Sequence, residues 1–122
     1  MDKFDLAQTT TDPEILDELS RDEDWMVRWR VAYNSNTSPE TLDYLSRGED
    51  FVVRYRVAEN INTSPETLKQ MSIDEDYLYV KHAIKANPNC PLETWKYLSA
   101  LEIITALPKV SKKTSRTYNK KR

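Results

Sequence analysis

The two side chains best suited to chemistry in this chain are His82 and Cys90, each the only residue of its type. A histidine can transfer protons near neutral pH, and a cysteine thiolate can attack as a nucleophile. A reactive thiol needs a base beside it, and the segment around Cys90, NPNCPLET, supplies none. We expect His82 to be a packed or half-exposed residue and Cys90 to fill a turn.

Two acidic DED clusters, at 22–24 and 74–76, could instead hold a cation. Both lack the glycine and the bidentate glutamate spacing of a calcium loop. A single glycine leaves no room for a glycine-rich phosphate loop, and a single cysteine excludes a multi-cysteine metal site. We expect the clusters to cap helices and to pair with Arg28, Arg54 and Lys81. We therefore predict that the protein is not an enzyme and needs no cofactor.

These residues belong to a segment that is repeated along the chain. Three copies are followed by half of a fourth: DPEILDELSRDEDWMVRWRVAYN, SPETLDYLSRGEDFVVRYRVAEN, SPETLKQMSIDEDYLYVKHAIKAN and PLETWKYLSALEIITAL. Glu14, Glu40 and Glu66 lie 26 residues apart, and Glu93 follows after 27. A period in this range is typical of stacked repeats, in which each unit completes the core of its neighbour. The sequence predicts an all-α solenoid of about 3.5 two-helix repeats over residues 1–108, with an N-terminal cap around Phe4 and Leu6.

The first helix of each unit opens with a strong start signal. A capping side chain, a proline and an acid follow one another at 12–14, 38–40 and 64–66. Apolar residues then recur three positions apart, which places them on one helical face. They are Leu16 and Leu19, Leu42 and Leu45, and Leu68 and Met71.

The second helix of each unit is expected to begin at an aspartate and to end at an asparagine. The predicted N-caps are Asp24, Asp50 and Asp76, and the predicted C-caps are Asn34, Asn60 and Asn87 in the left-handed conformation. Arg28 and Arg54 fall on the buried side of these helices. An unpaired buried charge is costly, so we expect the turn carboxylates of the same or the next unit to pair with them.

The outward side of the second helices carries aromatic residues beside arginine, a composition typical of protein-binding hot spots. The candidate partner-binding residues are Trp29, Arg30, Tyr33, Tyr55, Arg56 and Tyr79. The alternative is that the aromatic side chains only pack against neighbouring helices. The row ends in alanine in the third unit, so it does not form a continuous positive track for phosphates.

The last helix, at about 92–107, is longer than the others and apolar on more than one face. The end of a solenoid normally carries a polar cap. Either Ile103 and Leu107 fold back over the third unit, or they contact another chain. We expect fold-back, and therefore a monomer rather than a homodimer through this helix.

Charge divides the chain sharply. Residues 1–108 carry 20 acidic and 11 basic side chains, a net charge of −9, whereas residues 109–122 carry seven basic and no acidic ones. The basic residues are Lys109, Lys112, Lys113, Arg116, Lys120, Lys121 and Arg122. We expect a disordered tail. It could be solvated or contact its own acidic body, bind an acidic protein, or neutralise nucleic-acid phosphates.

No apolar run approaches the ~18 residues that span a bilayer. The first ten residues, MDKFDLAQTT, lack the basic and apolar regions of a secretory signal, and the single cysteine fits a reducing compartment. These features predict a cytoplasmic protein that does not enter membranes.

The repeated string VRxxVAxN followed by TSPETLxxL resembles the leucine-rich repeat variant family and, more loosely, HEAT-like helical repeats. Val27-Arg28 to Leu45 and Val53-Arg54 to Met71 carry the resemblance, and the third unit carries it more weakly. The resemblance implies a right-handed stack of short helix pairs that serves as a binding scaffold. The iron–sulfur centre of some relatives needs a cysteine cluster that this chain lacks. We predict a non-enzymatic adaptor or inhibitor that captures a protein partner, with nucleic-acid binding by the tail as the alternative.

Overall fold

The computed structural model describes residues 1–107, and within them every element of secondary structure is an α-helix. The predicted all-α class is confirmed. The eight helices are α1 (Lys3–Thr9), α2 (Pro13–Leu19), α3 (Trp25–Tyr33), α4 (Pro39–Leu45), α5 (Phe51–Glu59), α6 (Pro65–Asp74), α7 (Leu78–Ala86) and α8 (Leu92–Ala106). The predicted basic tail, residues 109–122, lies outside the described residues.

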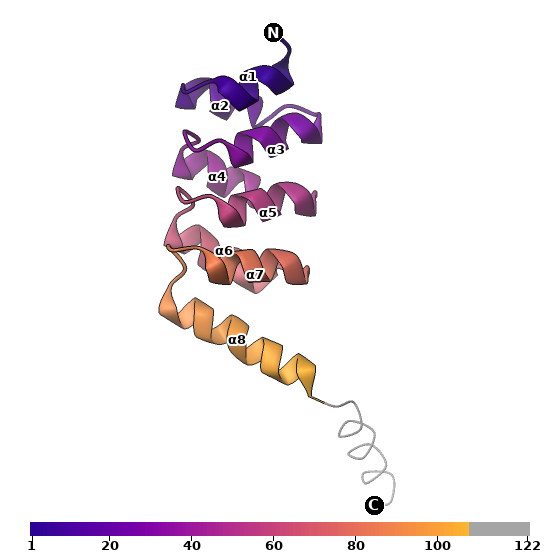
Figure 1. Ribbon diagram of the computed structural model, residues 1–122, viewed down its shortest axis with the longest axis vertical. Helices are drawn as coiled ribbons and strands as arrows, with labels where there is room; N and C mark the ends of the chain where they lie inside the picture. The colour runs from indigo at the N-terminus through magenta and orange to yellow at the C-terminus, as the bar shows by residue number, and fades with distance from the viewer. Residues whose placement is uncertain (108–122) are drawn as a thin grey trace, which may run out of the picture.

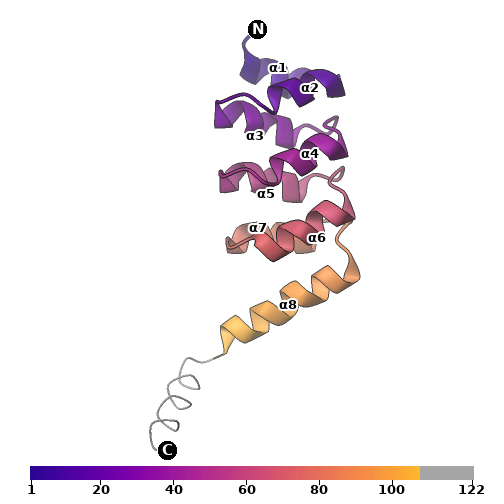
Figure 2. The same ribbon diagram turned by 180° about the vertical axis from the view of Figure 1, so that it is seen from behind.

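The helices stack in two columns (Figures 1 and 2). The second helices of the repeats form one column, in which α3 packs against α5 and α5 against α7. The first helices α2, α4 and α6 form the other column, and α8 lies at its far end. α1 packs on α3 and so occupies the place of a second helix at the N-terminal end.

The first helices begin as the sequence predicts. The Asp12 side chain accepts a hydrogen bond from Glu14 N at 2.9 Å, and the Ser38 hydroxyl accepts one from Thr41 N at 3.2 Å. Ser64 repeats the cap at Thr67 N. Two residues after the glutamate that recurs in each repeat comes a leucine that is completely buried between the columns: Leu16, Leu42 and Leu68.

The second helices begin less regularly than predicted. Asp24 caps α3, where it accepts a hydrogen bond from Met26 N at 2.9 Å. Asp50 stands at the N-cap of α5, but its side chain makes no capping bond because it pairs with Arg28. The predicted cap at Asp76 is wrong, since Tyr77 occupies that position. The third repeat has one extra residue before Val80, which shifts the start of the helix.

The predicted left-handed C-caps are also wrong. Asn34, Asn60 and Asn87 all have extended backbone, and no residue outside glycine has positive φ in the described part of the chain. Their side chains reach the preceding repeat instead. Asn60 Nδ2 donates to Ala32 O at 2.9 Å and to Asn34 O at 3.0 Å.

The same amide bonds recur in every repeat and form a buried asparagine ladder. Asn34 Nδ2 donates to carbonyls of Ala7 and Thr10, and Asn87 Nδ2 donates to those of Ala58 and Asn60. Buried carbonyls at the ends of helices need donors. The ladder supplies each of them from the next repeat, which keeps the second helices in register.

A second ladder consists of ion pairs and confirms the expected partners of Arg28 and Arg54, which are half-buried. Arg28 Nη2 lies 2.7 Å from Asp50 Oδ2, and Arg54 Nε lies 2.9 Å from Glu75 Oε1. Lys3 of α1 repeats the arrangement with Asp22 at 3.0 Å. Each cation thus reaches the acidic turn before the next second helix.

The stack ends in α8. We expected this helix to fold back over the third repeat, and that prediction is wrong. Thr94 and Leu98 are buried, and Glu102 holds the helix beneath α7 through Lys85 and His82, each at 3.2 Å. Beyond Glu102 the helix leaves the stack. Ile103, Ile104 and Leu107 are exposed.

Candidate partner-binding face

The six predicted binding residues lie on α3, α5 and α7, and the structure shows how they align. Val27, Val53 and Val80 occupy equivalent buried positions. Counting from them, Trp29, Tyr55 and His82 form one row, which we call the aromatic row. Arg30, Arg56 and Ala83 form the adjacent row, which we call the arginine row.

The arginines are interleaved with the aromatic rings. The guanidinium carbon of Arg30 lies 4.8 Å from the ring centroid of Phe4 on α1 and 4.6 Å from that of Trp29. Arg56 lies 5.1 Å from Trp29, 4.8 Å from Tyr33 and 5.7 Å from Tyr55. Each arginine therefore contacts a ring of its own helix and at least one ring of the helix before it in the same column. Such cation–π contacts hold the side chains in place.

The aromatic side chains were predicted either to be exposed for binding or to pack against neighbouring helices, and different residues do each. Trp29 and Tyr55 are half-buried and pack against the core. Tyr33 is 57% exposed although it stacks on Trp29, with centroids 6.3 Å apart, and Tyr79 is 75% exposed. We call the surface formed by Tyr33, Tyr79 and the two rows the second-helix face. Stacking and cation–π contacts bring five predicted residues together, and Tyr79 lies on α7 outside those contacts.

The charge of this face is unevenly balanced. Arg56 Nη1 pairs with Glu59 at 2.8 Å, whereas Arg30 has neither an ion pair nor a hydrogen bond to any residue from 1 to 107. The Nε atoms of both arginines are buried without a partner among these residues. Hydrogen bonding to Glu59 and its negative charge raise the pKa of Tyr55. Among residues 1–107, Arg30 is thus a cation of this face without an acidic partner.

A pocket of about 430 Å³ opens on the same face between α5 and α7, and sequence reasoning missed it. We call it the third-repeat pocket. It is lined by Tyr55, Glu59, Tyr79, His82, Ala83, Ala86, Asn87 and Pro88. A carboxylate and aromatic side chains share its wall.

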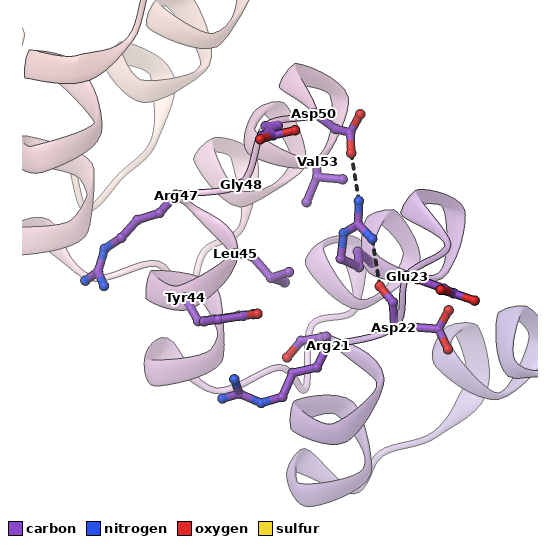
Figure 3. Close-up of a pocket in the computed structure, with 12 residues that line it drawn as sticks. Arg21, Asp22, Glu23, Tyr44, Leu45, Arg47, Gly48, Asp50 and Val53 are labelled. Carbon is purple, nitrogen blue, oxygen red and sulfur yellow. Dashed lines mark hydrogen bonds and ion pairs between the residues drawn. The ribbon is translucent and has the colours of Figure 1, made fainter.

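A larger groove, of about 490 Å³, lies where the first helices meet the acidic turns (Figure 3). Arg21 lies over the ring of Tyr44 at 4.3 Å, and the dashed lines of Figure 3 mark the bonds from Arg28 to Asp50 and to the Asp22 carbonyl. Arg47 pairs with Asp43. The arginines of this groove are already paired within the chain, so we regard it as a poorer recognition site.

The residues considered for catalysis do not assemble into a reactive group. His82 Nε2 pairs with Glu102, and Cys90 is half-buried in its turn. Within residues 1–107, no three histidine, cysteine or acidic side chains gather as metal ligands. No helix in the same range is long and apolar enough to cross a membrane.

Cys90 is expected to react slowly with thiol reagents. Burial raises the pKa of its thiol, so little of the reactive thiolate forms at pH 7. We expect the native protein to react with a disulfide reagent more slowly than the same protein unfolded in urea, which serves as the matched control. A faster native reaction would indicate an activated thiol.

The described residues define a class, an all-α protein of stacked helix pairs with an aromatic and arginine-rich face. No family model, no curated protein and no solved structure matches the chain. The resemblance to the leucine-rich repeat variant family therefore remains a prediction from the sequence.

Proposed function

We propose that the protein is a non-enzymatic binding module, an adaptor or inhibitor, that captures a protein partner on the second-helix face. The observation that carries the proposal is that exposed Tyr33 and Tyr79 lie on the same face as Arg30, a cation without an acidic partner among residues 1–107. Tyrosine and arginine bury much area when they bind a protein. Tyr33 and Arg30 lose little side-chain freedom because neighbouring rings already hold them.

Charge favours a protein over a nucleic acid on this face. A phosphate backbone needs several unpaired cations in a row. On this face Arg56 is paired with Glu59, and the arginine row ends at Ala83. A protein can instead present a single carboxylate to Arg30 and apolar surface to the tyrosines.

Nucleic-acid binding remains a second proposal, and it rests on residues 109–122 alone. Seven basic residues in this segment could neutralise several phosphates, which would make the affinity strongly dependent on salt. The same segment could also contact an acidic protein. We further propose that the protein is cytoplasmic, because its single cysteine fits a reducing compartment.

Capture from a lysate of the source organism separates the two proposals. Tagged full-length protein is incubated with lysate, with and without nuclease, and bound proteins are identified by mass spectrometry. One stoichiometric protein that survives nuclease would support the adaptor. A broad set of nucleic-acid-associated proteins that disappears with nuclease, and with deletion of residues 109–122, would move the function to that segment.

The double variant Tyr33→Ala, Tyr79→Ala is expected to lose at least about tenfold in affinity for the captured protein, because truncating exposed hot-spot residues typically costs 1–2 kcal/mol or more. The matched control is Tyr44→Ala, Tyr97→Ala. Both of its tyrosines are exposed, at equivalent positions on the first helices α4 and α8. Titration calorimetry measures the affinities. Equal losses from the two double variants would contradict the assignment of the face.

A further inference from the structure

The third-repeat pocket lies where the arginine row is interrupted. In the first two repeats the row is filled by Arg30 and Arg56. In the third repeat the equivalent residue is Ala83, whose side chain ends at Cβ. The pocket of about 430 Å³ opens beside this alanine.

The walls of the pocket correspond to the surroundings of Arg56. Arg56 lies against Trp29 and Tyr33 of the preceding helix and against Tyr55 of its own helix. One repeat later, the same positions are Tyr55, Glu59 and His82. All three line the third-repeat pocket. The chain therefore builds the walls of an arginine site without supplying the arginine.

Of the three residue changes in these walls, one adds a negative charge. Glu59 stands where the preceding repeat has Tyr33, so a carboxylate replaces a ring face. Glu59 Oε1 accepts a hydrogen bond from Arg56 at 2.8 Å, and its side chain is 38% exposed. A carboxylate has two oxygens and can accept from two guanidinium groups. Tyr55 also hydrogen-bonds to Glu59, and the lone pairs that remain on the carboxylate are the acceptors for an incoming cation.

We propose that the third-repeat pocket binds the guanidinium of an arginine side chain from the partner protein. The guanidinium stacks between Tyr55 and His82 and donates hydrogen bonds to Glu59, as a third member of the arginine row supplied in trans. A planar guanidinium suits this stacked site better than a lysine ammonium, which is a compact, strongly hydrated charge. This inference rests on the proposed function and names the chemistry of the partner at one point of its face.

Titration of the ¹⁵N-labelled full chain with N-acetyl-arginine methylamide tests the site without any partner. We expect saturable chemical-shift changes at residues 59, 82, 83 and 86. The citrulline analogue has the same shape without the charge, and we expect it to bind about tenfold or more weakly, since hydrogen bonds between charged groups are stronger than neutral ones. The lysine analogue is expected to fall between the two. Shifts that do not saturate, or equal binding of citrulline, would overturn the proposal.

Two variants link the pocket to its proposed occupant. Ala83→Arg should fill the pocket in cis, abolish the shifts, keep or raise the melting temperature, and weaken capture of the partner at least about tenfold. Glu59→Gln, which keeps the shape of the side chain, should reduce probe binding without unfolding the protein. Retention of probe binding by both variants would overturn the proposal.

The source of the arginine is tested separately. We expect the resonances of residues 82 and 83 to stay unchanged in the full-length double variant Arg116→Lys, Arg122→Lys. A change in these resonances would mean that the chain's own basic segment occupies the pocket, and it would overturn the partner as the source of the arginine. If N-acetyl-arginine methylamide does not bind, only the arginine site is contradicted, because partner capture is measured independently. Conversely, if the probe binds but no protein is captured, the proposed function is contradicted and the arginine site is still supported.

Discussion

Asn60→Ala is expected to lower the free energy of unfolding by about 3 kcal/mol, because it leaves several buried polar groups without partners. The side chain donates to Ala32 O and Asn34 O and accepts from Asn62 N at 2.8 Å. All three bonds are lost together, and water cannot easily replace them beside a side chain that is almost completely buried. Urea denaturation followed by circular dichroism measures the change.

Asn36→Ala is the matched control for this prediction. Asn36 is exposed, and its amide donates only to Asn34 Oδ1 at 3.2 Å. We expect a loss below about 1 kcal/mol, within the usual range of surface substitutions. Similar losses from the two asparagines would mean that the ladder between repeats contributes little to stability.

Arg54→Met is expected to destabilise the protein by about 3–4 kcal/mol, because it leaves a buried carboxylate without its counter-ion. Glu75 is only 2% exposed and accepts hydrogen bonds from Arg54 Nε and Nη2. Arg28→Met should cost less, since its partner Asp50 is 42% exposed and can be solvated. Thermal and urea denaturation of both variants give the comparison.

The double variant Arg54→Met, Glu75→Gln provides the control for this second prediction. Removal of both charges should recover part of the loss, because the penalty comes from the orphaned charge rather than from the missing pair. The ion-pair ladder does not act as described if Arg54→Met leaves the free energy of unfolding unchanged. The same holds if the double variant loses more of that free energy than Arg54→Met and Glu75→Gln lose together as single variants.

Much of the fold follows from the sequence because the repeat makes every local pattern visible three times. Leu16, Leu42 and Leu68 recur at a fixed spacing and are completely buried, as the helical period predicts. Arg28 and Arg54 were predicted on the buried side of their helices, where they would need acidic partners; they are half-buried, and the turns supply those partners. These inferences need only the geometry of one helix and its neighbour.

The inferences that failed depend on distances between repeats. The sequence shows asparagine at the end of each second helix, and a left-handed cap is its usual role. Only the stack reveals that Asn60 lies within reach of carbonyls in the preceding repeat, where its amide is used instead. The exposed end of α8 is a similar case. Its apolar residues suggested fold-back, but Glu102 ties the helix beneath α7 and directs Ile103 outward.

The candidate face could be predicted in part. Aromatic and arginine residues at matching positions were visible in the sequence, and the structure brings Trp29, Arg30, Tyr33, Tyr55 and Arg56 together. Their interleaving was not visible, because each arginine contacts rings of two helices. The third-repeat pocket was missed because it opens where a small residue, Ala83, stands in the arginine row. The alignment of Ala83 with Arg30 and Arg56 in the sequence could have indicated this gap.

Photo-cross-linking tests most directly the central claim that the second-helix face contacts a protein. Benzoylphenylalanine replaces Tyr79 in one full-length protein and Tyr97 in a control, both exposed tyrosines, on α7 and α8 respectively. After irradiation in lysate treated with nuclease, we predict a covalent adduct with one protein from position 79 and none with that protein from position 97. An adduct with the captured protein from position 97 alone would contradict the account.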